Sequence, residues 1–142
     1  MSTMRYPEMM IAPYRAQVTR LGAQELRTPE QVDAFLGQHA DGALIVVNSI
    51  CGCAGGTMRP ALEILHSSGT LPAAFGVVFA GADLEATDRV RALHEPYPPS
   101  SPAMIYFRDG AVAFIMERGD IQGRAVEDVA ATLTDGIAAA DS

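Results

Sequence analysis

Residues 43–53 read ALIVVNSICGC, and this stretch decides the fold class of the chain. Its first five positions, 43–47, are all apolar and rich in branched residues, which is typical of a short strand buried on both faces of a sheet. Asn48 ends the run, and Cys51 and Cys53 follow at once. Apolar residues then recur at helical spacing at Met58, Leu62 and Leu65. A buried strand that leads through two thiols into a helix predicts an α/β domain.

Upstream of this strand, three signals agree on the start of a helix. Thr28 can cap it, Pro29 suits its first position, and Gln31 completes a capping box. Before this helix we expect a short edge strand at 23–26. An N-terminal helical extension of about residues 1–22 precedes that strand.

Downstream, Asp109 and Gly110 lie between two apolar runs, which is a strong hairpin signal. Pro60 falls inside the helix that follows the thiols, so we expect a kink there. The other expected elements are a strand at 75–80, a helix at 84–93, hairpin strands at 104–107 and 112–116, and a last helix with its apolar stripe at 126–137. A βαβ half followed by a ββα half predicts one domain over residues 1–142, with a mixed central sheet flanked by helices.

The composition excludes several classes of protein. The chain has 142 residues, of which 49% are hydrophobic and 19% charged, so it can bury a core and is not disordered. Lys and Arg total 10 against 17 for Asp and Glu, and the net charge of -7 argues against nucleic acid or an anionic membrane as a partner. Residues 1–14 lack the continuous apolar stretch of a secretory signal. We therefore expect a cytoplasmic protein.

The chain has 2 cysteines, and they form the motif Cys51-Gly52-Cys53. A disulfide framework needs several cysteines spread along the chain, so a close pair in the cytosol indicates redox or metal chemistry. Cys51 follows the strand and should lie at the helix N-terminus, where backbone N–H groups stabilise a thiolate. We therefore predict Cys51 as the nucleophile and Cys53 as the resolving thiol.

The spacing of the two cysteines makes a disulfide feasible but strained. In a helix, residues two apart have Cα atoms about 5.4 Å apart, within the disulfide range of roughly 4.4–6.8 Å. The side chains would lie on nearly opposite faces, so closure needs an unusual backbone between them. Gly52 permits such a backbone most easily.

Other interpretations of these residues remain open. The two thiols could hold zinc or an iron–sulfur cluster, although a tetrahedral site needs four ligands. The three histidines have no ligand spacing and fit surface or helix-end positions: His39, His66 and His94. Arg59 lies about two helical turns beyond Cys51, so we expect it to be solvated and not a thiolate partner. Met9 and Met10 are expected to pack in the core.

Several stretches together resemble the bacilliredoxins. The strongest is Asn48 to Ala54 with Arg59-Pro60-Ala61 behind it, and residues 28–35, 79–81 and 98–102 also resemble stretches of this family. The resemblance implies a thioredoxin-like fold with an N-terminal extension. It also implies that Ser101-Pro102 is a cis-proline loop that faces the thiols and offers backbone groups to a substrate.

The activity implied by the resemblance is thiol–disulfide exchange. Bacilliredoxins remove bacillithiol, a low-molecular-weight thiol, from mixed disulfides on cytosolic proteins, and disulfide isomerase activity has also been ascribed to them. The expected catalytic residues are Cys51 and Cys53, with Gly52, Ser101 and Pro102 positioning the substrate. No cofactor or metal is expected to be bound, since bacillithiol or a similar thiol is a co-substrate, and the expected partners are cytosolic proteins that carry mixed disulfides.

The chain departs from the family pattern in two places. Some members have a cysteine near the C-terminus, whereas residues 138–142 here read AAADS. A mechanism that uses such a third thiol is therefore closed to this chain. Gly119 stands where members tend to have a histidine, so no role for that imidazole can be transferred.

Overall fold

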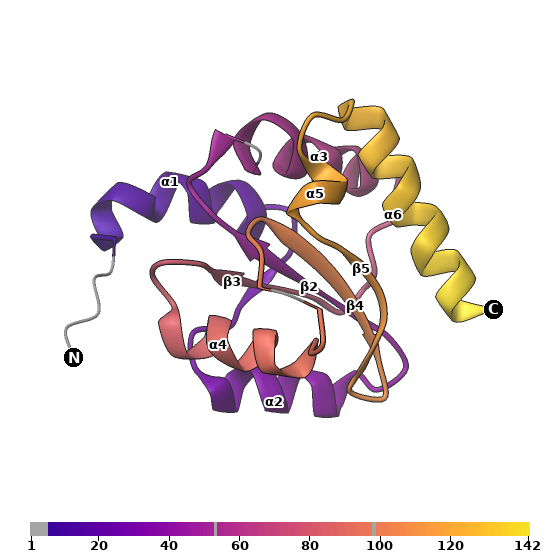
Figure 1. Ribbon diagram of the computed structural model, residues 1–142, viewed down its shortest axis with the longest axis horizontal. Helices are drawn as coiled ribbons and strands as arrows, with labels where there is room; N and C mark the ends of the chain where they lie inside the picture. The colour runs from indigo at the N-terminus through magenta and orange to yellow at the C-terminus, as the bar shows by residue number, and fades with distance from the viewer. Residues whose placement is uncertain (1–5, 53, 98) are drawn as a thin grey trace.

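The computed structural model describes residues 6–52, 54–97 and 99–142, and it contains a five-stranded sheet in the order β1-β3-β2-β4-β5 (Figure 1). The strands are β1 (Gln24–Glu25), β2 (Ala43–Asn48), β3 (Phe75–Phe79), β4 (Ala103–Arg108) and β5 (Ala111–Met116). The helices are α1 (Glu8–Thr19), α2 (Pro29–Gln38), the π-helix η1 (Ala54–Met58), α3 (Arg59–Ser67), α4 (Leu84–Leu93), α5 (Arg118–Ile121) and α6 (Val126–Asp141).

The apolar run that decided the fold class forms the central strand β2. All six of its residues are buried. It pairs in parallel with β3 and antiparallel with β4, so that Val46 lies opposite Val77 on one side and Met104 on the other. The predicted mixed sheet is confirmed, because the first strand pairs of the chain are parallel and the last are antiparallel.

Helices cover both faces of the sheet, as Figure 1 shows with α2 and α4 below it and α1, α3 and α6 above it. Alternate residues of β2 face the two layers, as strand geometry requires. Leu44 and Val46 pack with Met58 of η1, with Leu62 of α3 and with residues of α6. Ile45 and Val47 instead pack against α2 and α4.

Two local signals work as the sequence predicts. The hydroxyl of Thr28 accepts from the backbone N–H of Gln31 at 3.1 Å, and so caps α2. The Gln31 side chain, expected to bond the N–H of the cap residue itself, accepts instead from the N–H of Arg27. In the β4–β5 hairpin both turn residues have positive φ, 53° at Asp109 and 75° at Gly110, which matches a type I′ turn.

The irregular region after the thiols differs from the expectation. Pro60 lies in the first turn of α3, which follows η1 directly, so its place within a longer helical segment agrees with the sequence. The irregularity lies before it, in the five-residue π-helix η1. The short helix α5 was not expected from the sequence.

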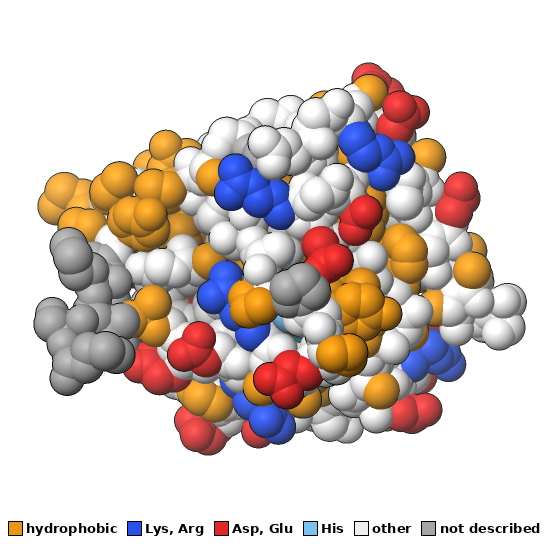
Figure 2. Space-filling view, viewed as in Figure 1, with side chains coloured by type: hydrophobic (Ala, Val, Ile, Leu, Met, Phe, Trp, Pro, Cys, Tyr) orange, Lys and Arg blue, Asp and Glu red, His pale blue; other side chains and the backbone are white. Residues whose placement is uncertain are grey.

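The N-terminal region contains the expected helix, and Met9 and Met10 in it are not core residues. The side chain of Met9 is 90% exposed and that of Met10 is 49% exposed. Figure 2 shows hydrophobic side chains gathered at the end of the molecule where α1 begins. The prediction that Met9 and Met10 pack in the core is therefore wrong. Among the described helices, none combines the length and apolar character needed to cross a membrane.

Candidate active site

Cys51 lies between the end of β2 and the helical segment that follows, as predicted. Its carbonyl oxygen accepts from the backbone N–H of Ala54 at 3.1 Å and of Gly55 at 3.3 Å, so Cys51 accepts the first hydrogen bonds of the helical segment. Its own N–H donates to the hydroxyl of Ser49 at 3.2 Å. The side chain is half-buried against the sheet face that α3 covers. The thiol therefore sits at a helix N-terminus, which favours the thiolate.

The other two residues of the motif, Gly52 and Cys53, are not found as clearly as Cys51. Cys53 lies outside the described residues, so its role stays a prediction. Gly52 is exposed, its φ is not in the left-handed region, and a Cβ there would meet nothing within 4 Å. In this conformation the backbone at Gly52 does not require glycine, and the unusual backbone expected for a Cys51–Cys53 disulfide stays a prediction.

Ser101 and Pro102 form the predicted cis-proline loop, because the peptide bond between them is cis. The loop lies beside Cys51 for a topological reason. Pro102 directly precedes β4, and β4 runs antiparallel to β2, so Ala103 pairs with Val47 near the end of β2. The start of β4 and the end of β2 thus meet at one edge of the sheet. A second cis bond, Glu95-Pro96, was not anticipated.

A cavity of about 300 Å³ brings the thiol and this loop together. Cys51 and Ser101 both line it, as do Tyr6 and two arginines that the sequence analysis did not single out, Arg91 and Arg118. Tyr6 reaches it because its N–H donates to the carbonyl of Gly81 at 3.0 Å. The cavity therefore combines a thiol, the loop that contains the cis-proline bond, and positive charge.

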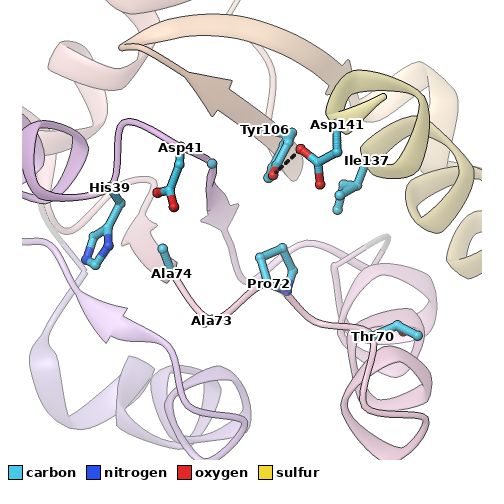
Figure 3. Close-up of a pocket in the computed structure, with 10 residues that line it drawn as sticks. His39, Asp41, Thr70, Pro72, Ala73, Ala74, Tyr106, Ile137 and Asp141 are labelled. Atoms are coloured by element: carbon cyan, nitrogen blue, oxygen red, sulfur yellow. Dashed lines mark hydrogen bonds between the residues drawn. The ribbon is translucent and has the colours of Figure 1, made fainter.

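A larger cavity of about 420 Å³ lies elsewhere and contains no thiol. Gly42, just before β2, lines it, so it is at the opposite end of that strand from Cys51. Figure 3 shows His39 and Asp41 on one side of it and Tyr106 and Asp141 on the other. The Tyr106 hydroxyl donates to Asp141 at 2.8 Å. Burial, together with that carboxylate, raises the pKa of Tyr106 above its ordinary value.

Arg59 is buried beside the thiol and is not solvated, so that prediction is wrong. Arg59 is only 3% exposed. The guanidinium donates to the side-chain oxygen of Asn48 and the carbonyl of Ser49, both at 2.9 Å, and to the side chain of Gln17 at 2.6 Å. It also stacks over the ring of Tyr14, 5.1 Å from its centroid. All these partners are neutral at pH 7.

The electrostatics of Arg59 link it to Cys51. Burial lowers the pKa of Arg59 from its ordinary value, while negative charge on Tyr14 or on Cys51 opposes that lowering. Because this interaction is reciprocal, the charge of Arg59 stabilises the thiolate of Cys51. Counting turns of an α-helix missed the contact, because a π-helix separates the two residues. In the sequence, the feature that comes closest to indicating this arrangement is the polar side chain of Asn48 at the end of β2, which accepts from Arg59.

The histidines do not gather around the thiol. All three lie at helix ends, as expected, but His94 is buried and only 1% exposed. Among residues 6–52, 54–97 and 99–142, no group of three or more His, Cys, Asp or Glu side chains could hold a metal ion.

Comparison with known proteins places the chain in a family. A family model described as disulphide isomerase matches residues 6–139. A bacilliredoxin of Cytophaga hutchinsonii is 44% identical over 128 residues, which cover 90% of this chain and 94% of that protein. A bacilliredoxin of Koribacter versatilis is 43% identical, with 91% and 89% covered. One from Salinibacter ruber is 44% identical, with 96% and 81% covered.

Solved structures agree on the fold. Thioredoxin of Malassezia sympodialis superposes with a TM-score of 0.57 at 14% identity, covering 84% of this chain and 91% of that one. Oxidised thioredoxin of Plasmodium falciparum gives a TM-score of 0.54 at 14% identity, with 80% and 95% covered. At this identity the likeness establishes the fold alone. With a thioredoxin fold and these relatives, the chain belongs to the bacilliredoxin family.

Proposed function

We propose that this protein is a cytoplasmic thiol–disulfide oxidoreductase that removes a low-molecular-weight thiol, such as bacillithiol, from mixed disulfides on proteins. One observation carries the proposal: Cys51 lines the same cavity as Ser101, the residue that precedes the cis-proline Pro102. A reactive thiol at a helix N-terminus is the arrangement that lowers a cysteine pKa, and the opposed loop leaves room for a disulfide. Family membership and the thioredoxin fold support a redox role of this kind.

The first step is attack by the Cys51 thiolate on the sulfur of the small thiol. The bond between that sulfur and the client protein breaks, a new disulfide joins the small thiol to Cys51, and the client leaves as a thiolate. The client is thereby reduced, and the oxidising equivalent stays on Cys51. Attack through a thiolate is the general route of disulfide exchange.

Two routes can clear the adduct. The thiolate of Cys53 can attack the Cys51 sulfur, which closes a Cys51–Cys53 disulfide and releases the small thiol. Low-molecular-weight thiols then reduce that disulfide and become oxidised to their own disulfide. In the other route a second small thiol attacks the adduct directly, and Cys53 is not needed.

Gly52, Ser101 and Pro102 position the incoming disulfide in this proposal. Gly52 is exposed beside the nucleophile and carries no side chain that would block a client. Ser101 lines the cavity with Cys51. Backbone groups of an extended loop can pair with an extended substrate segment.

Isomerisation of protein disulfides is the second candidate function, and the description of the matching family model favours it. The same thiolate would attack a disulfide between two client cysteines. A protein that uses both thiolates to hold a metal or an iron–sulfur cluster is the remaining alternative, and metal content after purification without added metal would reveal it.

Intact mass spectrometry tests the proposal. The parent, Cys51→Ser and Cys53→Ser are each mixed with a client protein that carries bacillithiol in a mixed disulfide. A bacillithiol adduct on the Cys53→Ser protein, with no adduct on Cys51→Ser, is the expected result. A client that stays unreduced by the parent, with no adduct on any variant, would refute small-thiol removal and leave isomerase substrates to be tried. Reduction of more than one equivalent of client by Cys53→Ser, when free small thiol is added to clear the adduct, would assign the one-thiol route.

A further inference from the structure

The charges around Cys51 differ from those on the rest of the molecule. Five arginines pair with carboxylates: Arg15, Arg20, Arg27, Arg89 and Arg108. Of the four other described arginines, which form no ion pair with a described residue, three lie around the thiol. The fourth, Arg124, donates to the carbonyl of Asp120 and the hydroxyl of Thr132. Arg59 bonds Asn48 and Ser49 just before the thiol, and Arg91 and Arg118 line its cavity. No Asp or Glu occurs among the described residues that line this cavity.

Arg91 has an unsatisfied donor. It projects from the last turn of α4, and its Nε atom is buried without a hydrogen-bond partner in the part of the chain that the structure describes. A buried N–H that has lost its water and gained no acceptor is costly. Because Arg91 also lines the cavity, this unsatisfied donor belongs to a side chain that a ligand in the cavity would contact.

Arg118 brings a second guanidinium from another part of the chain. It begins α5, and its backbone N–H donates to the hydroxyl of Ser100 at 3.2 Å, one residue before the cis-proline loop. Among described residues, its side chain bonds only Gln122, through Nε at 3.3 Å. Its terminal N–H groups are therefore available to a ligand.

We propose that the cavity beside Cys51 selects mixed disulfides whose small-thiol half carries a carboxylate, and that Arg91 and Arg118 bind this carboxylate. The inference rests on the proposed function and specifies its substrate class. Guanidinium groups are the side chains best suited to carboxylates, since their planar N–H groups match two oxygens. The cavity of about 300 Å³ is at the lower end of the range for small-molecule sites, so it fits a small thiol and leaves the client protein outside.

Alkylation of Cys51 measures the selectivity without any redox turnover. Iodoacetate and iodoacetamide deliver groups of the same size to a thiolate, and only the first carries a carboxylate. The ratio of their rates is measured in a Cys53→Ser background, then after adding Arg91→Gln or Arg118→Gln. We expect each substitution to lower the iodoacetate-to-iodoacetamide ratio about threefold, which is within the range measured for a solvent-exposed ion pair.

The control is Arg89→Gln, which removes the same charge from the same helix. Arg89 pairs with Asp33 on α2 at 2.8 Å and does not line the cavity, so the ratio should not change. Arg91→Lys keeps the charge and should retain most of the ratio. An equal ratio in parent, Arg91→Gln and Arg118→Gln would overturn the proposal.

Turnover separates this inference from the proposed function. One client is prepared as mixed disulfides with 3-mercaptopropionate, 2-mercaptoethanol and cysteamine, which are anionic, neutral and cationic. Because each variant is compared with the parent on the same substrate, differences in leaving-group chemistry cancel. Loss confined to the 3-mercaptopropionate client supports carboxylate binding. An equal loss on all three clients refutes it while the redox function stands, and a parent inactive on all three contradicts the redox function itself.

Discussion

At the scale of single residues, Arg59 is a buried cation that a nearby negative charge would stabilise. The guanidinium is buried, and every described partner that it bonds is neutral. A buried cation is stabilised only by paired charge or by many hydrogen bonds. Negative charge on Tyr14 or on Cys51 opposes the lowering of the pKa of Arg59 by burial, so a thiolate at Cys51 would stabilise this guanidinium.

Replacing Arg59 by Gln should therefore raise the pKa of the Cys51 thiol by about 1, the lower end for loss of a nearby opposite charge. The measurement is the pH dependence of iodoacetamide alkylation in a Cys53→Ser background. The rate profile should move to higher pH, because more of the thiol stays protonated at each pH. Arg59→Lys keeps the charge and should restore most of the profile, whereas a merely structural role would not be rescued in this way. An unchanged profile in a folded Arg59→Gln protein would contradict the role.

The residues of the site differ in how far the sequence could reveal them. Cys51 lies in a short local motif, so its position could be predicted, whereas the cis-proline loop at Ser101 could be expected only from the resemblance to a family. Arg91 and Arg118 come from the end of α4 and the start of α5, and only the folded chain brings them to the same cavity. Nothing in their local sequence distinguishes them from surface arginines.

At the scale of elements, the π-helix η1 is what places Arg59 against the thiol loop. A Cβ on Gly55 would lie 2.8 Å from the Nη2 atom of Arg59, whereas a Cβ on Gly56 would meet nothing within 4 Å. Such single π turns are frequent at functional sites. The lack of a side chain at Gly55 is therefore a requirement of the close approach of the guanidinium.

This pair of glycines gives a matched test of the element. Gly55→Ala should push the guanidinium from its hydrogen bonds, reduce the free energy of unfolding by about 1–2 kcal/mol, as overpacking does, and raise the pKa of Cys51. Gly56→Ala gains the same helix propensity with no clash and should be neutral or slightly stabilising. Urea unfolding and the alkylation profile measure both effects. Equal stability and equal profiles for the two variants would show that η1 does not position Arg59.

Most elements could be predicted from the sequence because local rules decide them. The apolar run of β2, the Thr28 cap and the Asp109-Gly110 turn each obey a short-range rule, and each is found. The π-helix η1 and the four-residue α5 could not be predicted, since no periodic pattern marks such short segments. Their positions follow from packing against the sheet.

At the scale of the whole molecule, α1 belongs to the site although it lies far from the thiols in sequence. Gln17 and Tyr14 of this helix hold the guanidinium of Arg59, and Tyr6 before it lines the cavity. Arg15 ties α1 to the rest of the fold, because it donates to both oxygens of Asp83 at 2.7 and 2.9 Å. Burial lowers the pKa of Arg15, but Asp83 and Glu8 outweigh it and raise that pKa above its ordinary value.

Replacing Arg15 by Gln should therefore act on stability and on the thiol together. The Arg15 and Asp83 side chains are only 8% and 5% exposed, and removal of one partner from a buried ion pair costs about 3 kcal/mol. Directly after the same helix Arg20 pairs with Glu63, but these side chains are 60% and 47% exposed, so Arg20→Gln should cost less than about 1 kcal/mol. Urea unfolding measures the difference. If α1 supports Arg59, Arg15→Gln alone should also move the alkylation profile of Cys51 to higher pH. A large loss of stability with an unmoved profile would separate the anchoring of α1 from the reactivity of the thiol.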